Sequence, residues 1–223
     1  MDGKLFGRAI VKFLSGVLLM GLLLFLPAGT LRWRQGWLLM GLLFIPMFGA
    51  GLVMLFKAPE LLKKRLNAKE EQGEQRIVLL LSGLMFLAAF VVAGLNFRFG
   101  WLALPEAVSW AGAAVFLLGY ILYARVLQEN EWLSRTVEVQ QGQKVVDTGL
   151  YGVVRHPMYM TTLLLFLSMP LVLGSAISFV IMLAYIPIIA RRIRNEEDVL
   201  LRGLEGYAEY RRKVRYKVIP FVW

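Results

Sequence analysis

The side chains able to do chemistry in this chain are few, and most of them lie in its last third. The 223 residues contain no cysteine and a single histidine, His156. Thiolate nucleophiles, disulfides and metal sites built from cysteines or several histidines are therefore excluded, and we expect no metal centre. Catalysis in this protein would have to use carboxylates, arginines, tyrosines and one imidazole.

One candidate element surrounds this histidine. It reads Arg155-His156-Pro157-Met158-Tyr159, and Tyr151 comes shortly before it. Proline is favoured at the first position of a helix, because the N–H group that it lacks would have no helical partner there. We therefore expect a helix to begin at Pro157 and to hold Arg155 and His156 at its mouth.

A second candidate element comes about 40 residues later. Arg192 is followed by the adjacent pair Glu196 and Glu197, and then by Tyr207 and Tyr210. Neighbouring residues on a helix point about 100° apart, so the two glutamates are expected to have separate partners. One carboxylate would face a ligand while the other faces a second ligand or Arg192.

Long uncharged runs indicate which elements position these residues. A helix needs roughly 20 apolar residues to cross a membrane. The qualifying runs are Phe13–Leu31, Trp37–Phe56, Ile77–Phe97, Ala107–Ala124 and Pro157–Ala190. The last run is too long for one span, and Gly174-Ser175 at its middle is a turn signal. We predict an all-α fold, a polytopic membrane helix bundle of about six spans whose last two form a tight hairpin of short helices, with kinks at Pro170 and Pro187.

Basic residues predict the orientation of this bundle. With six spans, only Arg32, Arg34 and Arg98 of the 25 lysines and arginines fall on one side. Because Lys and Arg accumulate in cytoplasmic loops, both termini are predicted to be cytoplasmic. The net charge of +10 is then explained by anionic headgroups, and we expect no nucleic-acid partner. A bacterial inner membrane is the expected location.

A hairpin of this kind returns the chain to the side from which it started. His156 and Arg155 would then lie at the same depth as Arg192, Glu196 and Glu197, in one pocket facing the cytoplasm. We therefore divide the chain into residues 1–127, a transmembrane scaffold, and residues 128–223, a region with the candidate site residues, the hairpin and a cytoplasmic helical tail.

At these residues the chain resembles the superfamily of isoprenylcysteine carboxyl methyltransferases and phospholipid methyltransferases, which are integral membrane enzymes. The shared pattern runs, in order, Thr148-Gly149-x-Tyr151, Arg155-His156-Pro157-x-Tyr159, a hydrophobic hairpin, Glu196-Glu197-x-x-Leu200, Gly206-Tyr207-x-x-Tyr210 and Ile219-Pro220. The resemblance covers roughly residues 143–223. It implies S-adenosyl-L-methionine as cofactor and a lipophilic methyl acceptor among the membrane lipids.

The resemblance implies that residues 1–127 include the acceptor-side helices and that residues 128–223 form the cofactor-binding region. It also implies roles for individual residues. The catalytic candidates are Arg192, Glu196 and Glu197. The cofactor-binding candidates are Gln143, Tyr151, Arg155, His156, Pro157, Tyr159, Glu196, Glu197, Tyr207 and Tyr210. Arg155 and His156 would complement the carboxylate of the cofactor, and a glutamate its ammonium or ribose hydroxyls. Arg192 or Arg194 would aim a carboxylate acceptor.

Two departures from the family pattern leave the acceptor open. Thr161 stands where many relatives have glycine, and Leu150 where a proline is frequent. A prenylated cysteine, a phospholipid amine and a fatty acid all remain candidates. The oligomeric state is not predicted.

Two other functions compete with methyl transfer. Membrane sterol reductases use NADPH and carry a similar arginine-histidine element, although they usually have asparagine-tyrosine where this chain has Met158-Tyr159. A non-catalytic membrane scaffold would keep the same spans. Cofactor binding distinguishes the three possibilities.

Overall fold

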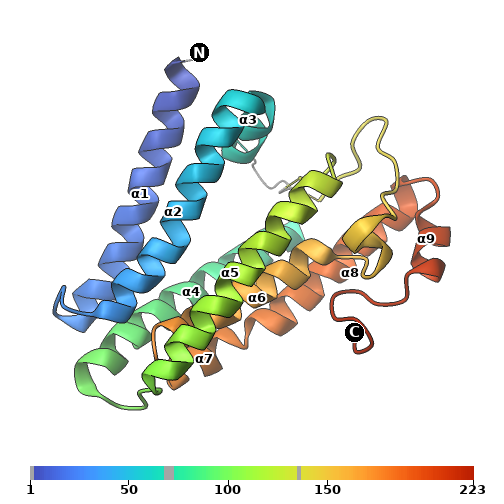
Figure 1. Ribbon diagram of the computed structural model, residues 1–223. Coiled ribbons are helices and arrows are strands. Elements are labelled where there is room, and N and C mark those ends of the chain that lie inside the picture. Colours follow the sequence, from blue (N-terminus) through green and yellow to red (C-terminus); the bar gives the residue numbers. More distant parts are fainter. Residues whose placement is uncertain (1–2, 68–72, 135–136) are drawn as a thin grey trace.

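The computed structural model describes residues 3–67, 73–134 and 137–223, and its regular elements are helices. They are α1 (Gly3–Ala28), α2 (Arg34–Lys57), α3 (Pro59–Asn67), α4 (Gly73–Phe99), α5 (Glu106–Glu129), the 3-10 turn η1 (Gly149–Gly152), α6 (Pro157–Val172), α7 (Ala176–Met182), α8 (Tyr185–Gly203) and α9 (Tyr207–Lys213). The all-α prediction is confirmed. The connections α1–α2, α4–α5 and α6–α7 lie at one end of the bundle, and α9 and the C-terminus lie toward the other (Figure 1).

Several helices are long and apolar enough to cross a membrane. Among the described residues there are five such segments: Leu5–Ala28, Arg34–Lys57, Arg76–Phe99, Glu106–Glu129 and Ala176–Gly203. Large apolar side chains such as Leu26 and Ile45 are 74% exposed on their outer surfaces, as expected where helices face hydrocarbon. The chain is therefore an integral membrane protein.

The number of spans and their orientation stay predictions. The count is open because α6 is short. Its 16 residues would be about 24 Å long at a rise of 1.5 Å per residue, less than a typical hydrocarbon core. If α6 is a sixth span, neighbouring helices must cover its ends where they do not reach the membrane surface. Of the basic residues used for the orientation, Lys69 and Arg135 lie outside the described residues.

The predicted hairpin is present, with its turn at Gly174. This glycine has a φ of +71°, a conformation that residues with a Cβ rarely adopt. The carbonyl of Gly174 accepts a hydrogen bond from the N–H of Leu104, and the N–H of Ala176 donates to Leu102, so the α4–α5 connection fixes the turn. Ser175 then caps α7, because its hydroxyl accepts from the N–H of Ser178.

The returning arm of the hairpin differs from the predicted single short helix. It is divided into α7 and α8 by a break at residues 183–184, and α8 continues through the charged residues to Gly203. Pro187 lies in the first turn of α8, where its missing N–H costs little. The interruption includes Leu183, four positions before Pro187, whose carbonyl is the one that a helical proline cannot bond, and both interrupted residues keep helical φ and ψ angles. The kinks at Pro170 and Pro187 stay predictions.

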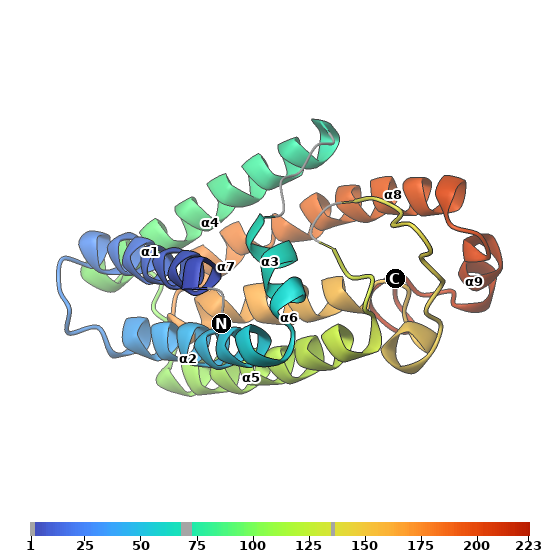
Figure 2. The same cartoon turned by 90° about the horizontal axis from the view of Figure 1, so that it is seen from above.

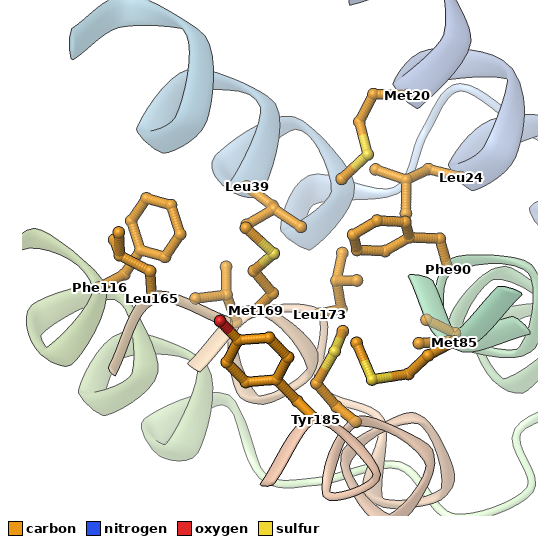
Figure 3. Packing of buried hydrophobic residues seen from close by; sticks show 14 of the residues in the cluster. Met20, Leu24, Leu39, Met85, Phe90, Phe116, Leu165, Met169, Leu173 and Tyr185 are labelled. Carbon is orange, nitrogen blue, oxygen red and sulfur yellow. The ribbon is translucent and has the colours of Figure 1, made fainter. Parts of the chain in front are cut away.

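Close packing of α5 on α6 forms one wall of the core. A Cβ atom on Gly112 would lie 2.9 Å from Leu171 and from the backbone of Val172, so only glycine allows this approach. Met20, Leu39, Phe116 and Met169, from four different helices, lie in one apolar cluster (Figure 3). Seen from above, α6 lies between α5 and α8, which places the start of α6 near the charged half of α8 (Figure 2).

Candidate active site

The structure places the two charged elements at the same end of the hairpin. His156 occupies the position before α6, and the helix begins at Pro157 as predicted. Arg192 and Glu197 are buried residues of α8, which packs against α6. Side chains that are 41 positions apart in the chain therefore contact each other.

Glu197 is the centre of a buried charged group. Its Oε1 accepts a hydrogen bond from Nε of Arg155 at 2.7 Å and lies 3.3 Å from Nε2 of His156. Its Oε2 lies 3.5 Å from Nζ of Lys217. Arg155, His156 and Glu197 are each at most 6% exposed. A carboxylate removed from water in this way requires charged or hydrogen-bonding partners. Arg155, His156 and Lys217 supply them and hold the carboxylate in one position.

Glu196 faces a different set of partners, as predicted for adjacent helical residues. Its Oε2 accepts a hydrogen bond from the Tyr159 hydroxyl, and that hydroxyl accepts one from Nε of Arg192 at 2.9 Å. Its Oε1 lies 3.8 Å from Nδ1 of His156. The Glu196 side chain is 26% exposed, against 5% for Glu197. Glu196 is therefore the glutamate of the pair that a ligand can reach.

A cavity lies beside this network. One wall carries the predicted site residues Tyr151, Arg155, His156, Tyr159, Arg192, Glu196, Tyr207 and Tyr210. The other wall comes from the segment between α5 and η1 and includes Trp132, Val137 and Gln143. Including its opening to solvent, the cavity contains about 840 Å³ of space free of atoms.

Tyr207 lines this cavity, and its hydroxyl oxygen is an unused polar atom that is buried from solvent. The residue is 4% exposed, and its hydroxyl has no hydrogen-bond partner among the described residues. Tyr210, by contrast, donates its hydroxyl to the carbonyl of Tyr151 at 2.8 Å. Burial raises the pKa of the phenols of Tyr151, Tyr207 and Tyr210 above the usual value, so all three stay protonated at neutral pH. Tyr207 is thus a hydrogen-bond donor that lacks an acceptor.

Three of the predicted site residues do not offer a free side chain to the cavity. Gln143 lines the cavity, but its Oε1 accepts from the N–H of Gln140 at 2.9 Å. Pro157 opens α6 and is absent from the cavity wall. Arg194, the alternative to Arg192 for aiming an acceptor, lines a separate surface hollow with Arg191 and Asp198. The structure therefore favours Arg192 over Arg194 for that role.

Sequence reasoning missed Lys217 and the wall residues Trp132 and Val137. Lys217 belongs to the basic tail, which looks like a solvated charge run from its composition. Trp132 and Val137 lie in a connection without helical periodicity. No signal in the sequence marks these residues, because each reaches the site through the course of an irregular segment.

The polar groups of the cavity fit the cofactor that the family resemblance implies. A methionine-derived moiety brings an ammonium and a carboxylate, and a nucleoside brings hydroxyl groups. The partly exposed carboxylate of Glu196 complements the ammonium or the hydroxyl groups, and the buried Tyr207 hydroxyl, which has no partner among the described residues, could donate to a ligand only after becoming accessible. Within the described residues, no cluster of His, Asp or Glu could hold a metal ion.

The chain was compared with families and structures of known proteins. Residues 107–205 match the family model described as phospholipid methyltransferase, and this segment contains both charged elements and the hairpin between them. The predicted resemblance to integral membrane methyltransferases is confirmed. The matched segment begins at the start of α5, whereas the predicted division at residues 127 and 128 stays a prediction.

The proteins similar to this chain include a membrane methyltransferase and a sterol reductase. The first is a solved structure of the eukaryotic intramembrane Ras methyltransferase, isoprenylcysteine carboxyl methyltransferase, with a TM-score of 0.57 and 20% identity over 94% of this chain and 74% of that one. At this identity the likeness shows the fold alone. The second is the Delta(14)-sterol reductase of Mus musculus, 29% identical over 91 residues, which are 40% of this chain and 22% of the reductase. This chain therefore spans about a fifth of the length of that curated relative.

Proposed function

We propose that this protein transfers a methyl group from S-adenosyl-L-methionine to a lipophilic acceptor at the cytoplasmic surface of a membrane. The observation that carries the proposal is the cavity bordered by Glu196, Tyr207 and His156, next to the buried pair of Arg155 and Glu197. The match of residues 107–205 to phospholipid methyltransferases supports it.

Three side chains of the site would bind polar parts of this cofactor. Glu196 would receive the ammonium or the ribose hydroxyls, and the Tyr207 hydroxyl would donate to an acceptor atom. Arg155 is less available for the carboxylate, because its Nε binds Glu197 and its Nη1 donates to the carbonyls of Val214 and Arg215. The carboxylate of the cofactor would therefore depend mainly on His156.

When bound, S-adenosyl-L-methionine supplies an activated methyl group, which an acceptor lone pair takes while the sulfur keeps the bonding electrons. The protein then has to align the two reactants and exclude water, and such positioning can supply several kcal/mol. Both helices that carry the charged network, α6 and α8, also carry buried apolar side chains, among them Leu163 and Ile189. They favour an acceptor with a hydrocarbon chain.

The demand on the charged residues depends on the acceptor. A carboxylate is already deprotonated at neutral pH and needs no base. Arg192 would then offset the repulsion between this carboxylate and the two glutamates. An amine acceptor must lose a proton before it attacks, and Glu196 is the better base because Glu197 is held by Arg155 and Lys217.

The proposal is tested with the full-length protein purified in detergent. Isothermal titration calorimetry with S-adenosyl-L-methionine should show micromolar binding. Incubation with the methyl-labelled cofactor and a membrane lipid extract should then label one lipid class, as read by mass spectrometry. Absence of binding would rule out methyl transfer at this cavity.

A reductase function is the second candidate, because 91 residues are similar to the Delta(14)-sterol reductase. Met158 stands where such relatives usually have asparagine, which argues against it. A parallel titration with NADPH, followed by the absorbance of the reduced nicotinamide, separates the two enzymes. Failure to bind either cofactor would favour a non-catalytic membrane scaffold.

A further inference from the structure

The segment after α9 is paired with the chain that carries Arg155 and His156. The N–H of Arg155 donates to the carbonyl of Tyr216 at 2.9 Å, and the N–H of His156 donates to that of Lys217 at 2.8 Å. The guanidinium of Arg155 also donates to the two preceding carbonyls of this segment, at 2.7 Å each. The tail therefore fixes the backbone at the mouth of α6.

The same segment is anchored on both sides of Lys217. Val214 is 4% exposed and packs with Tyr207 and Tyr210, and Val218 is fully buried in the main core. The carbonyl oxygen of Trp223 accepts the N–H group of Val218 at 2.9 Å. These anchors hold the backbone of Lys217 in one place, so its side chain reaches a defined position.

Lys217 completes the set of partners around Glu197. Arg155 and His156 both contact Oε1 of the carboxylate, and the ammonium of Lys217 lies 3.5 Å from Oε2. The Lys217 side chain is 25% exposed, so the pair is only partly screened by water. Because the ammonium of Lys217 attracts Oε2, it opposes rotation of the Glu197 carboxylate about the Cγ–Cδ bond.

We propose that Lys217 is a positioning residue, which holds the Glu197 carboxylate and through it the imidazole of His156 at the edge of the cavity. The effect on the ring is independent of any activity, whereas the effect on turnover rests on the proposed methyl transfer. Lys217 does not line the cavity, and its side chain acts through Glu197, whereas its backbone hydrogen bond to His156 is kept in any substitution.

The experiment uses the fact that His156 is the single histidine of the chain. Full-length protein with ring-labelled histidine in detergent micelles should give one set of imidazole NMR signals. Three variants are compared with it: Lys217→Met, Lys217→Arg and the control Arg215→Met. The control removes the same charge from an exposed side chain of the same segment.

The proposal expects the imidazole signals to move by more than their width in Lys217→Met, to return toward the original positions in Lys217→Arg, and to stay unchanged in Arg215→Met. Methyl transfer should fall about tenfold in Lys217→Met, mainly in kcat, with recovery in Lys217→Arg. Unchanged imidazole signals in Lys217→Met would overturn the inference. If these signals move but the parent protein transfers no methyl group, the positioning role stands and the proposed function fails.

Discussion

Nε2 of His156 lies 3.3 Å from Oε1 of Glu197, and Nδ1 of the same ring lies 3.8 Å from Oε1 of Glu196. The imidazole thus separates a buried carboxylate, which is paired with Arg155, from a carboxylate that borders the cavity. Only the imidazole of His156 would lie between a ligand bound to Glu196 and the Arg155–Glu197 ion pair, which joins the two ends of the hairpin. Ligand binding and stability at this end of the bundle are therefore expected to be coupled.

Replacing the ring should weaken cofactor binding. In His156→Ala, the affinity for S-adenosyl-L-methionine is expected to fall at least about tenfold, because a contact to a charged group contributes about 1.5–3 kcal/mol. Arg194→Ala is the matched control, since Arg194 lies in a separate surface hollow and should bind normally. Equal affinities of the two variants, measured by calorimetry, would exclude His156 from the site.

The hydroxyl of Tyr207 should matter only when a ligand is present. Because it has no partner among the described residues, Tyr207→Phe is expected to keep or raise the stability of the free protein, by up to about 1 kcal/mol. The same change should weaken cofactor binding about tenfold, as followed by melting temperature with and without the cofactor.

Tyr210→Phe provides the comparison for this variant. It removes the hydrogen bond to the carbonyl of Tyr151 and should lower the stability of the free protein by about 1 kcal/mol. A destabilised Tyr207→Phe with normal cofactor affinity would show that the Tyr207 hydroxyl has a structural role.

Breaking the buried ion pair should cost far more stability than breaking the exposed one, because it leaves a buried charge without its partner. Glu197→Ala leaves Arg155 without its carboxylate and should cost about 3 kcal/mol of unfolding free energy. Asp147→Ala breaks the pair with Lys213, whose side chains are both exposed, and should change stability little because water screens the charges. Melting temperatures in detergent test the order, and similar losses in both variants would contradict the assigned burial.

Close packing of α5 on α6 predicts a steric effect at Gly112. In Gly112→Ala, the new methyl group would meet Leu171 and Val172 at 2.9 Å, at an expected cost of about 1–3 kcal/mol. Gly83→Ala in α4 meets nothing within 4 Å and should be neutral or slightly stabilising, since alanine favours helix. Thermal unfolding of both variants checks the difference, and a neutral Gly112→Ala would show that α5 and α6 separate more easily than their packing implies.

The sequence by itself determined the elements and the ends of the hairpin. The length of the uncharged runs predicted the long helices, Pro157 predicted the start of α6, and Gly174 predicted its turn, because each depends on local conformational preferences. The return of the chain at Gly174 then predicted that His156 would meet Glu196 and Glu197. Their functional roles are still predictions.

Only the tertiary structure decided which glutamate is buried and what completes the site. The sequence placed Glu196 and Glu197 on different sides of one helix, but their partners depend on how α8 is rotated against α6. Lys217 and the wall around Trp132 reach the site through irregular segments whose path has no sequence period. Such positions are fixed by long-range packing and by backbone hydrogen bonds between distant residues, and neither can be inferred from neighbours along the chain.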